Sequence, residues 1–336
     1  MTDPIQDGAR DFLGRTMSGR LSIRPIAGDA STKQFYRVRA SRRTAVLVVN
    51  PEPFGADSPL LSNHRILESI GAPVPRLIAR DDRQGLVLAE DLGDDTLLRY
   101  LLGGVGGRRR STRPAQTWIR LYREACDLIV LLQTEARKAI RPEDFAARNA
   151  LDKERFLFEL GHFHRYFIIG LKERKPDPAG EAVLQAFYAD LAEECDRMRR
   201  VYCHRDLMSR NLMLKGRRLR LIDYQDARMG PYTYDAASLL RDSSLDLDER
   251  LVQAMIDYLA GRLGEGPEEF RSDFDTMALQ RNIKELGTFG YMATVRGLKG
   301  YLEFVPRAIL SIRRTMRREQ RHHYVYPVLE RYALST

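Results

Sequence analysis

The pattern of hydrophobic and polar residues changes character near residue 92. Before it, short runs rich in β-branched and aromatic residues alternate with turn residues. These runs fall at 21–23, 35–39, 45–49, 76–79 and 85–89. One helical pattern, over 59–70, interrupts them. This spacing predicts a small antiparallel sheet with one helix inserted between its strands.

Beyond residue 92 the hydrophobic positions recur mostly with the period of a helix. The segments predicted to be helical are 115–139, 151–170, 179–199, 247–263 and 271–295. Short hydrophobic runs joined by polar turns, at 200–203, 212–214 and 219–222, predict strands of a hairpin among them. We therefore expect an α+β protein with two lobes: a small antiparallel-sheet lobe over 1–92 and a larger, mainly helical lobe over 93–336.

The polar turns of this hairpin carry the most specific pattern in the chain. His204, Arg205 and Asp206 precede Asn211, and the next hydrophobic strand ends in Asp223. Phosphoryl transfer from ATP needs a carboxylate that orients the acceptor hydroxyl and accepts its proton, and oxygen ligands for magnesium. We interpret Asp206 as the catalytic carboxylate and Asn211 and Asp223 as magnesium ligands. The alternative, a salt-bridged turn that spells these letters by chance, is disfavoured by the fixed spacing.

Composition narrows the class of protein. The chain has 336 residues, 43% of them hydrophobic, which is enough for two lobes with a substantial core. Its cysteines, Cys126, Cys195 and Cys203, have no metal-ligand spacing and predict a reducing compartment. The apolar runs are too short to cross a bilayer, and the first residues lack a signal-peptide pattern. We expect a cytoplasmic protein without a membrane partner.

Positive charge is in excess. Lys and Arg number 55 against 46 Asp and Glu, a formal net charge of +9, with dense runs at 108–110 and 313–323. Such a balance is compatible with nucleic acid, an acidic membrane or an anionic substrate. We interpret both runs as solvated surface, with a surface loop over 103–114. We expect a small-molecule substrate and no nucleic-acid partner. We also expect a monomer, although no residue pattern decides the oligomeric state.

Together these motifs resemble the aminoglycoside phosphotransferase and choline kinase superfamily of protein-kinase-like enzymes. The resembling features run from Gly28 to about Arg307. The resemblance implies a two-lobed protein-kinase-like fold that uses ATP and Mg²⁺. It also implies a hinge near Ala89–Leu92 that binds adenine through backbone groups, which makes Glu90 and Leu92 candidate nucleotide-binding residues.

Within that superfamily the chain is most similar to bacterial cell-wall recycling kinases that phosphorylate the anomeric hydroxyl of N-acetylmuramate and N-acetylglucosamine. The pieces that carry this likeness, in order, are 28–31, 35–37, 209–213, 222–227, 234–235, 238–242, 279–284 and 300–302. The likeness implies an amino-sugar substrate and a role in peptidoglycan recycling. Two alternatives stay open: a kinase of another small hydroxyl compound, such as an amino alcohol or an aminoglycoside, and a catalytically silent kinase-like module that uses its basic runs to hold a partner.

The phosphate-binding side departs from the protein-kinase pattern. The third strand, 44–50, lacks the lysine that normally holds the α- and β-phosphates. The turn over 28–33 offers a substitute, because its backbone N–H groups around Ser31 can face a phosphate oxygen and Lys33 adds a positive charge. The alternative for Lys33 is a solvated turn residue.

Candidate acceptor-binding residues lie on both sides of the hairpin. Glu159 and Arg165 are polar members of the helix over 151–171, and the likeness to the recycling kinases implies that Glu159 binds a sugar hydroxyl. Asp226, just beyond the magnesium ligand, is placed to touch substrate or support the metal. Each has the alternative of local pairing or simple exposure. Further on, Gly230 and Pro231 are expected to form a turn, and Asp235 to cap a helix or bond the catalytic loop.

Overall fold

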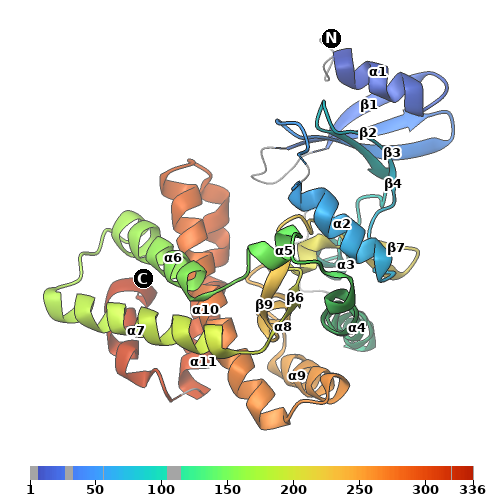
Figure 1. The fold of residues 1–336 in the computed structure, drawn as a ribbon. Helices are drawn as coiled ribbons and strands as arrows, with labels where there is room; N and C mark the ends of the chain where they lie inside the picture. Colours follow the sequence, from blue (N-terminus) through green and yellow to red (C-terminus); the bar gives the residue numbers. More distant parts are fainter. Residues whose placement is uncertain (1–6, 27–32, 56, 104–114, 319, 336) are drawn as a thin grey trace.

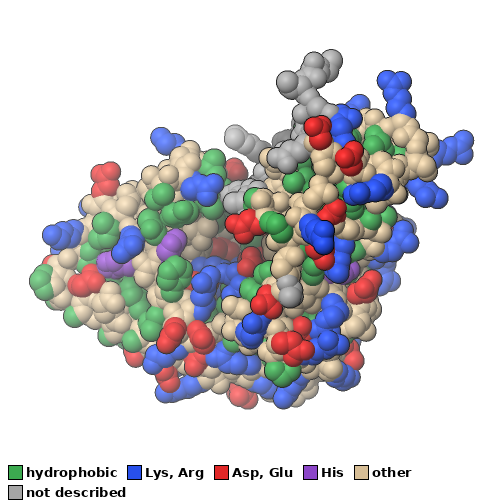
Figure 2. Space-filling model, turned by 45° about the horizontal axis from the view of Figure 1, so that its top comes forward, with side chains coloured by type: hydrophobic (Ala, Val, Ile, Leu, Met, Phe, Trp, Pro, Cys, Tyr) green, Lys and Arg blue, Asp and Glu red, His purple; other side chains and the backbone are tan. Residues whose placement is uncertain are grey.

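The computed structural model describes residues 7–26, 33–55, 57–103, 115–318 and 320–335. Within them the chain forms a sheet lobe and a larger, mainly helical lobe (Figure 1). The two-lobed α+β architecture expected from the sequence is confirmed. In the space-filling view the surface is hollowed where the lobes meet (Figure 2).

The sheet lobe is a five-stranded antiparallel sheet with the order β1-β2-β3-β5-β4. Its strands are β1 (Leu21–Ile26), β2 (Gln34–Ala40), β3 (Arg43–Val49), β4 (Leu77–Asp81) and β5 (Leu86–Glu90). These bounds agree with the hydrophobic runs to within a few residues. Strand β5 lies between β3 and β4, so its end, which leads into the next lobe, is held on both sides.

Helix α1 (Asp7–Thr16) packs on this sheet and was not predicted. Its Phe12 and Leu13 are buried in a small core with Val38 and Leu88. Only a few of its positions are apolar, and they supply a stripe too narrow to stand out as a helical period. The sheet lobe therefore has a core of its own.

Helix α2 (Pro59–Ser69) begins at a clear signal. The Ser58 side chain accepts a hydrogen bond from the backbone N–H of Leu61, and proline occupies the first helical position. Its buried Ile66 and Leu67 belong to the large core of the helical lobe rather than to the small core under α1. Helix α2 therefore ties the sheet lobe to the helical lobe.

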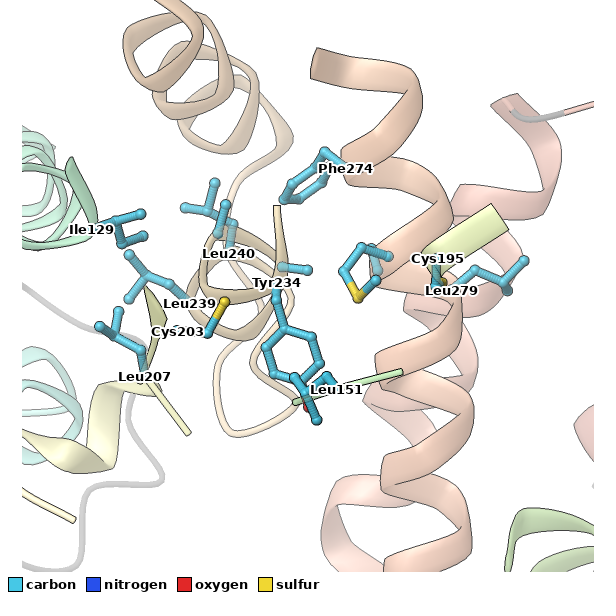
Figure 3. Close-up of a cluster of buried hydrophobic side chains, with 14 of the residues drawn as sticks. Ile129, Leu151, Cys195, Cys203, Leu207, Tyr234, Leu239, Leu240, Phe274 and Leu279 are labelled. Carbon is cyan, nitrogen blue, oxygen red and sulfur yellow. The ribbon is translucent and has the colours of Figure 1, made fainter. Parts of the chain in front are cut away.

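The helical lobe is built around one large hydrophobic core, part of which is shown in Figure 3. Its helices are α3 (Leu97–Leu101), α4 (Ala115–Ala139), α5 (Phe145–Arg148), α6 (Lys153–His162), α7 (Pro178–Arg197), α8 (Tyr234–Leu240), α9 (Glu249–Leu263), α10 (Pro267–Thr294), α11 (Val305–Arg318) and α12 (Tyr326–Leu329), with short turns of tighter or wider helix η2 (Ser209–Asn211), η3 (Lys299–Phe304), η4 (His323–Val325) and η5 (Glu330–Leu334). The side chains labelled in Figure 3 come from α4, β6, α7, α8 and α10 and from two connecting segments, which supply Leu151 and Leu207. The hairpin that carries the candidate site is therefore set into a packed helical scaffold.

The hairpin region contains two strand pairs. Strand β7 (Leu212–Lys215) pairs with β8 (Arg218–Leu221), as the sequence predicts, and β6 (Arg200–Cys203) pairs with β9 (Arg228–Pro231). The expected turn at Gly230 and Pro231 is wrong, because both residues end β9. A Cβ atom at Gly230 would lie 2.8 Å from Cδ1 of Leu151 and 3.3 Å from Sγ of Cys203, so a side chain here would make these neighbours shift.

The helix predicted over 151–170 continues past α6, but in a different form. After His162 the chain forms a π-helical segment, η1 (Phe163–Leu171), which packs against α10. A Cβ atom at Gly290 of α10 would lie only 2.3 Å from the carbonyl oxygen of Tyr166. Glycine lets the two backbones touch and brings the polar residues of α6 and α10 together beside the catalytic loop.

Candidate active site

Two buried carboxylates bond the backbone of the loop over 204–211, which follows β6 and is called the catalytic loop below. Asp235 accepts hydrogen bonds from the backbone N–H groups of His204, at 2.7 Å, and Arg205, at 2.9 Å. Asp242 accepts one from the backbone of Ser209, at 3.0 Å. Burial raises the pKa of Asp235, and these N–H groups oppose that rise. Asp235 thus bonds the catalytic loop, one of the two structural roles expected for it.

The structure brings Asp206, Asn211 and Asp223 together. The amide nitrogen of Asn211 donates to the backbone oxygen of Asp206 at 2.8 Å and lies 3.5 Å from Oδ2 of Asp223. Asp223 has a φ of +65°, an unusual conformation for a residue other than glycine, and its carboxylate is exposed. Gln225 donates to its other oxygen at 2.7 Å.

This arrangement has the donor chemistry of a magnesium site. The nitrogen of Asn211 is committed to the loop, so the residue offers its amide oxygen, and Asp223 offers a carboxylate. Magnesium prefers oxygen ligands and usually takes only one or two carboxylates from the protein. No group of three or more His, Cys, Asp or Glu gathers to hold a metal in the part of the chain that the structure describes. The two residues therefore fit an ion that takes its other ligands from elsewhere.

The Asp206 carboxylate lies among positive charges. Burial alone would raise the pKa of this group, but the charges of Lys284, Arg205 and Arg281 outweigh burial and hold the pKa below its ordinary value. The carboxylate is therefore ionised at neutral pH. An ionised carboxylate has only acceptor oxygens, so it can accept a hydrogen bond from a hydroxyl group.

Glu159, on α6, is at the centre of a buried polar network. Its Oε1 atom lies 3.5 Å from a terminal nitrogen of Arg205 and 3.8 Å from Nζ of Lys284, and its Oε2 accepts a hydrogen bond from Gln280 at 3.0 Å. The side chain is only 4% exposed. Burial would raise the pKa of Glu159, but Lys284 and Arg205 together with the Gln280 hydrogen bond lower it. Glu159 therefore carries a negative charge that neutralises part of this cluster.

Asp226 links the same cluster to the magnesium-ligand loop. Its Oδ1 lies 3.2 Å from a guanidinium nitrogen of Arg205 and accepts a hydrogen bond from Arg228 at 3.0 Å. Arg228 also donates through Nε to the backbone oxygen of Asp226. Asp226 is thus locally paired, and it supports Arg205 beside Asp206.

Three further residues of the candidate site come from α10 and received no role from the sequence. Gln280 and Lys284 contact Glu159, and Arg281 donates to the backbone oxygen of Arg205 at 3.1 Å and to the hydroxyl of Tyr234 at 2.8 Å. The only signal was their place within the 279–284 stretch that carries the family likeness. Helical spacing could show that they share a face, but not what that face contacts.

Arg165 is not brought into this cluster. It lies on η1 and is exposed, and no hydrogen bond or ion pair joins it to Glu159 or Asp206 in the described structure. Its charge acts on His162, where burial and then Arg165 lower the pKa of the imidazole. The change to a π-helix after His162 alters the spacing on which the prediction for Arg165 depended.

On the sheet side, Lys33 lies at a cavity between the lobes. The cavity has a volume of about 430 Å³, and Lys33 shares its lining with Gln225 and Asp226. Burial lowers the pKa of Lys33, while Asp223 and Asp226 oppose that shift. Lys33 is therefore close to the magnesium-ligand loop. Ser31 and the rest of the turn over 28–32 lie outside the described residues, as does most of the expected loop over 103–114.

The expected hinge connects β5 to the helical lobe and is held by ion pairs. Nζ of Lys215 lies 2.6 Å from Glu90 Oε1 and donates to the backbone oxygen of Asp91 at 3.0 Å. Arg37 of β2 bonds the carboxylate of Asp91. Leu92 is buried. The side chain of Glu90 is therefore occupied by Lys215, so only backbone groups of this residue are available to a nucleotide.

Helix α2 reaches the magnesium-ligand loop directly. The side-chain amide of Asn63 donates to the backbone oxygens of Gln225 and Ala227, both at 3.0 Å, and His64 Nδ1 is 2.8 Å from the hydroxyl of Tyr224. These contacts fix the backbone just after Asp223. Sequence patterns do not predict these contacts, because the two segments are far apart along the chain.

The basic run near the C-terminus is largely paired within the molecule. Arg313 bonds Glu330, and Arg314 and Arg318 both contact Glu249. Arg318 also bonds Asp275 at 2.6 Å. This face of α11 is thus not a bare cationic surface.

The helices of the described residues are each too short or too polar to span a lipid bilayer.

A known protein family and several known proteins match most of this chain. The pattern of the phosphotransferase enzyme family matches residues 22–271. The N-acetylmuramate/N-acetylglucosamine kinase of Neisseria meningitidis serogroup B is 29% identical to the chain over 300 residues, which are 87% of this chain and 85% of that protein. The protein of the same name from Pseudomonas aeruginosa is 28% identical, over 84% of this chain and 80% of that one.

Solved structures show the same fold at low sequence identity. The choline kinase of Cryptosporidium parvum superposes with a TM-score of 0.62 at 12% identity, covering 96% of this chain and 98% of that one. The ADP-bound aminoglycoside phosphotransferase APH(2'')-Ib gives a TM-score of 0.59 at 12% identity, covering 93% and 99%. At this identity the likeness establishes the architecture.

Proposed function

Because the chain belongs to the phosphotransferase enzyme family, we propose that it transfers the γ-phosphoryl group of ATP to the anomeric hydroxyl of N-acetylmuramate, N-acetylglucosamine or both. The observation that carries the choice of sugar is the likeness to two kinases of that name over 87% and 84% of this chain. The geometry around Asp206 supports the transfer itself.

In this mechanism the residues of the helical lobe act on the acceptor. The ionised carboxylate of Asp206 accepts a hydrogen bond from the sugar hydroxyl, orients it for in-line attack and takes its proton as the bond to phosphorus forms. Asp235 and Asp242 keep the loop backbone in place. Asn211 and Asp223 would hold Mg²⁺, which neutralises charge on the phosphate oxygens when bound.

The sheet lobe supplies the nucleotide side of the proposal. Backbone groups near Leu92 would pair with adenine. Lys33 would face the phosphates in place of the lysine that the third strand lacks. The position of Lys33 at the cavity beside Asp226 supports this role. Solved relatives of the same fold bind ADP, which is consistent with ATP as the donor.

The acceptor side disfavours the runner-up, a kinase of an amino alcohol or an aminoglycoside. Such acceptors are cations, and a cationic substrate is bound best where carboxylates outnumber basic groups. Here the charges of Lys284, Arg205 and Arg281 act on Asp206, and Arg228 shares Asp226 with Arg205. A neutral or anionic sugar suits this wall better.

The other alternative is a catalytically silent module that holds a partner through its basic runs. The ion pairs of α11 weaken it, because they neutralise basic residues of the C-terminal run within the protein. The intact approach of Asn211 to Asp206 and Asp223 also argues for catalysis. A monomer, a cytoplasmic location and a role in peptidoglycan recycling stay predictions from the sequence.

The test is magnesium-dependent release of ADP from ATP with N-acetylmuramate, N-acetylglucosamine, choline and kanamycin as separate acceptors. We expect turnover with one or both amino sugars, lost in Asp206→Asn, and a product whose anomeric proton couples to phosphorus in the NMR spectrum. Turnover with choline or kanamycin alone would overturn the substrate. A product phosphorylated at another hydroxyl would overturn the anomeric assignment.

A further inference from the structure

The polar cluster beside Asp206 has more cations than carboxylates. Arg155, Arg205 and Lys284 share Oε1 of Glu159, at 3.6, 3.5 and 3.8 Å. Asp226 is likewise shared by Arg205 and Arg228. With the Asp206 carboxylate included, these four cations stand against three carboxylates, so this wall of the site retains positive charge. Retained positive charge at a binding wall favours an anion.

Most of these cations are already committed. Arg205 is 11% exposed and contacts both carboxylates, and Arg228 is 9% exposed with its guanidinium bound to Asp226. Lys284 is 16% exposed and donates to the hydroxyl of Tyr234 at 3.3 Å. Buried and bonded in this way, they have little capacity to meet an incoming ligand.

Arg155 is different. Its side chain is 38% exposed, and no hydrogen bond from its guanidinium is made in the part of the chain that the structure describes. Its Nε side faces Glu159, and its guanidinium lies over the ring of Phe158, 5.2 Å from the centroid. These two contacts hold the guanidinium at its Nε edge and at one face of its plane. Its two terminal nitrogens are then left as a pair of parallel N–H donors, which we call the fork.

The neighbouring charges place this fork at the acceptor side. Positive charge from Arg155 acts on Arg228, where burial, then Arg205, and also Arg155 lower the pKa of the guanidinium. Arg155 also shares the Glu159 oxygen with Arg205, the residue next to Asp206. Arg155 is therefore joined to the residue next to Asp206 through one shared carboxylate.

We propose that Arg155 is a specificity residue that binds the carboxylate of an acidic sugar held at Asp206. This inference rests on the proposed function, because the two amino sugars differ chemically in this respect: N-acetylmuramate carries a lactyl carboxylate and N-acetylglucosamine does not. A bidentate pair between a guanidinium and a carboxylate is directional and strong. Arg155 would thus favour N-acetylmuramate without taking part in phosphoryl transfer.

The experiment compares both sugars in the wild type, in Arg155→Met and in Arg155→Lys. We expect Arg155→Met to raise KM for N-acetylmuramate on the order of 10- to 100-fold, as for loss of a charge-assisted hydrogen bond. KM for N-acetylglucosamine, KM for ATP and kcat should stay within about twofold, the range of a residue outside the chemistry. Arg155→Lys keeps the charge but not the fork, so it should recover part of the loss.

Lys153→Met is the matched control. It removes one positive charge from the same helix, but Lys153 faces Glu193 of α7, at 2.6 Å, rather than the cluster. Its kinetics with both sugars should equal those of the wild type. Thermal unfolding of all three variants separates a binding effect from a folding defect.

Each outcome decides. An equal rise in KM for both sugars, a rise in KM for ATP, or no change in Arg155→Met would overturn the carboxylate assignment while leaving the proposed function intact. Failure of the wild type with both sugars would overturn the proposed function, and the assignment would fall with it. A selective loss for N-acetylmuramate that Lys153→Met does not reproduce would support the assignment.

Discussion

Replacing Glu159 by glutamine tests whether the buried network beside Asp206 depends on one negative charge. Glutamine keeps the shape of the side chain and an acceptor for Gln280, but it no longer compensates the charges of Arg205 and Lys284. Breaking a buried ion pair by neutralising one partner costs about 3–5 kcal/mol. Because Gln280 keeps its hydrogen bond and Arg205 keeps Asp226, we expect the low end, about 3 kcal/mol of unfolding free energy at pH 7.

The effect should depend on pH in a defined direction. The folded protein lowers the pKa of Glu159 below its ordinary value of 4.5, against the opposing effect of burial. An acid with a lowered pKa stabilises the fold at pH values above its ordinary pKa, and this contribution is lost as the pH falls through the folded value. The difference between wild type and Glu159→Gln should therefore be full at pH 7 and shrink progressively below pH 4.5.

Urea unfolding at several pH values between neutrality and the onset of acid unfolding measures this difference. Glu154→Gln is the control, because Glu154 lies on the same helix but is exposed. That variant should change the free energy of unfolding by about 0.5 kcal/mol or less. A cost for Glu159→Gln as small as that of the control, or one that does not vary with pH, would refute the electrostatic account of the network.

Three further changes test other parts of the structure. Asp206→Asn should lower kcat by about 10²- to 10⁴-fold, as for loss of a general base, with an unchanged circular dichroism spectrum. A variant with near wild-type kcat would contradict the role. Asp144→Asn should lose about 1–3 kcal/mol of unfolding free energy at pH 7, because Arg65 and a backbone N–H keep the Asp144 pKa below its ordinary value despite burial. Urea titrations should show this loss shrinking below pH 3.8. Gly290→Ala should lower the thermal midpoint, since its Cβ would lie 2.3 Å from a backbone oxygen, at a cost of about 1–3 kcal/mol; Gly261→Ala, in open space within α9, should raise it.

The parts of the site that lie close together in sequence could be predicted from it. Asp206 and Asn211 come just before one hairpin and Asp223 just after it, so the pairing of its two strands already brings them together. The sheet of the first lobe was predictable for a similar reason, because each strand pairs with a near neighbour or through one crossover. Local patterns determine local contacts.

The contacts made by distant segments could not be predicted in this way. Lys284 meets Glu159 only because α10 packs against α6 and η1, and that packing depends on close backbone contact at Gly290. The hydrophobic periodicity of α10 does not indicate that it packs against α6 and η1, and theirs does not indicate α10. The π-helical form of η1 was equally hidden, since its apolar positions fit an ordinary helix, and it left Arg165 outside the cluster.

The charge of the acceptor site illustrates the same limit. The net charge of +9 did not indicate where an anion would bind, because many cations are neutralised where they stand, as Arg313 is by Glu330 and Arg318 by Asp275. A ligand anion needs a cation that packing holds in place and whose hydrogen-bond donors are not already used within the protein. Arg155 meets that condition beside Glu159, whose single charge is shared among three basic groups. The anion-binding capacity of this enzyme therefore follows from unequal pairing at one wall of the cleft, and not from its total charge.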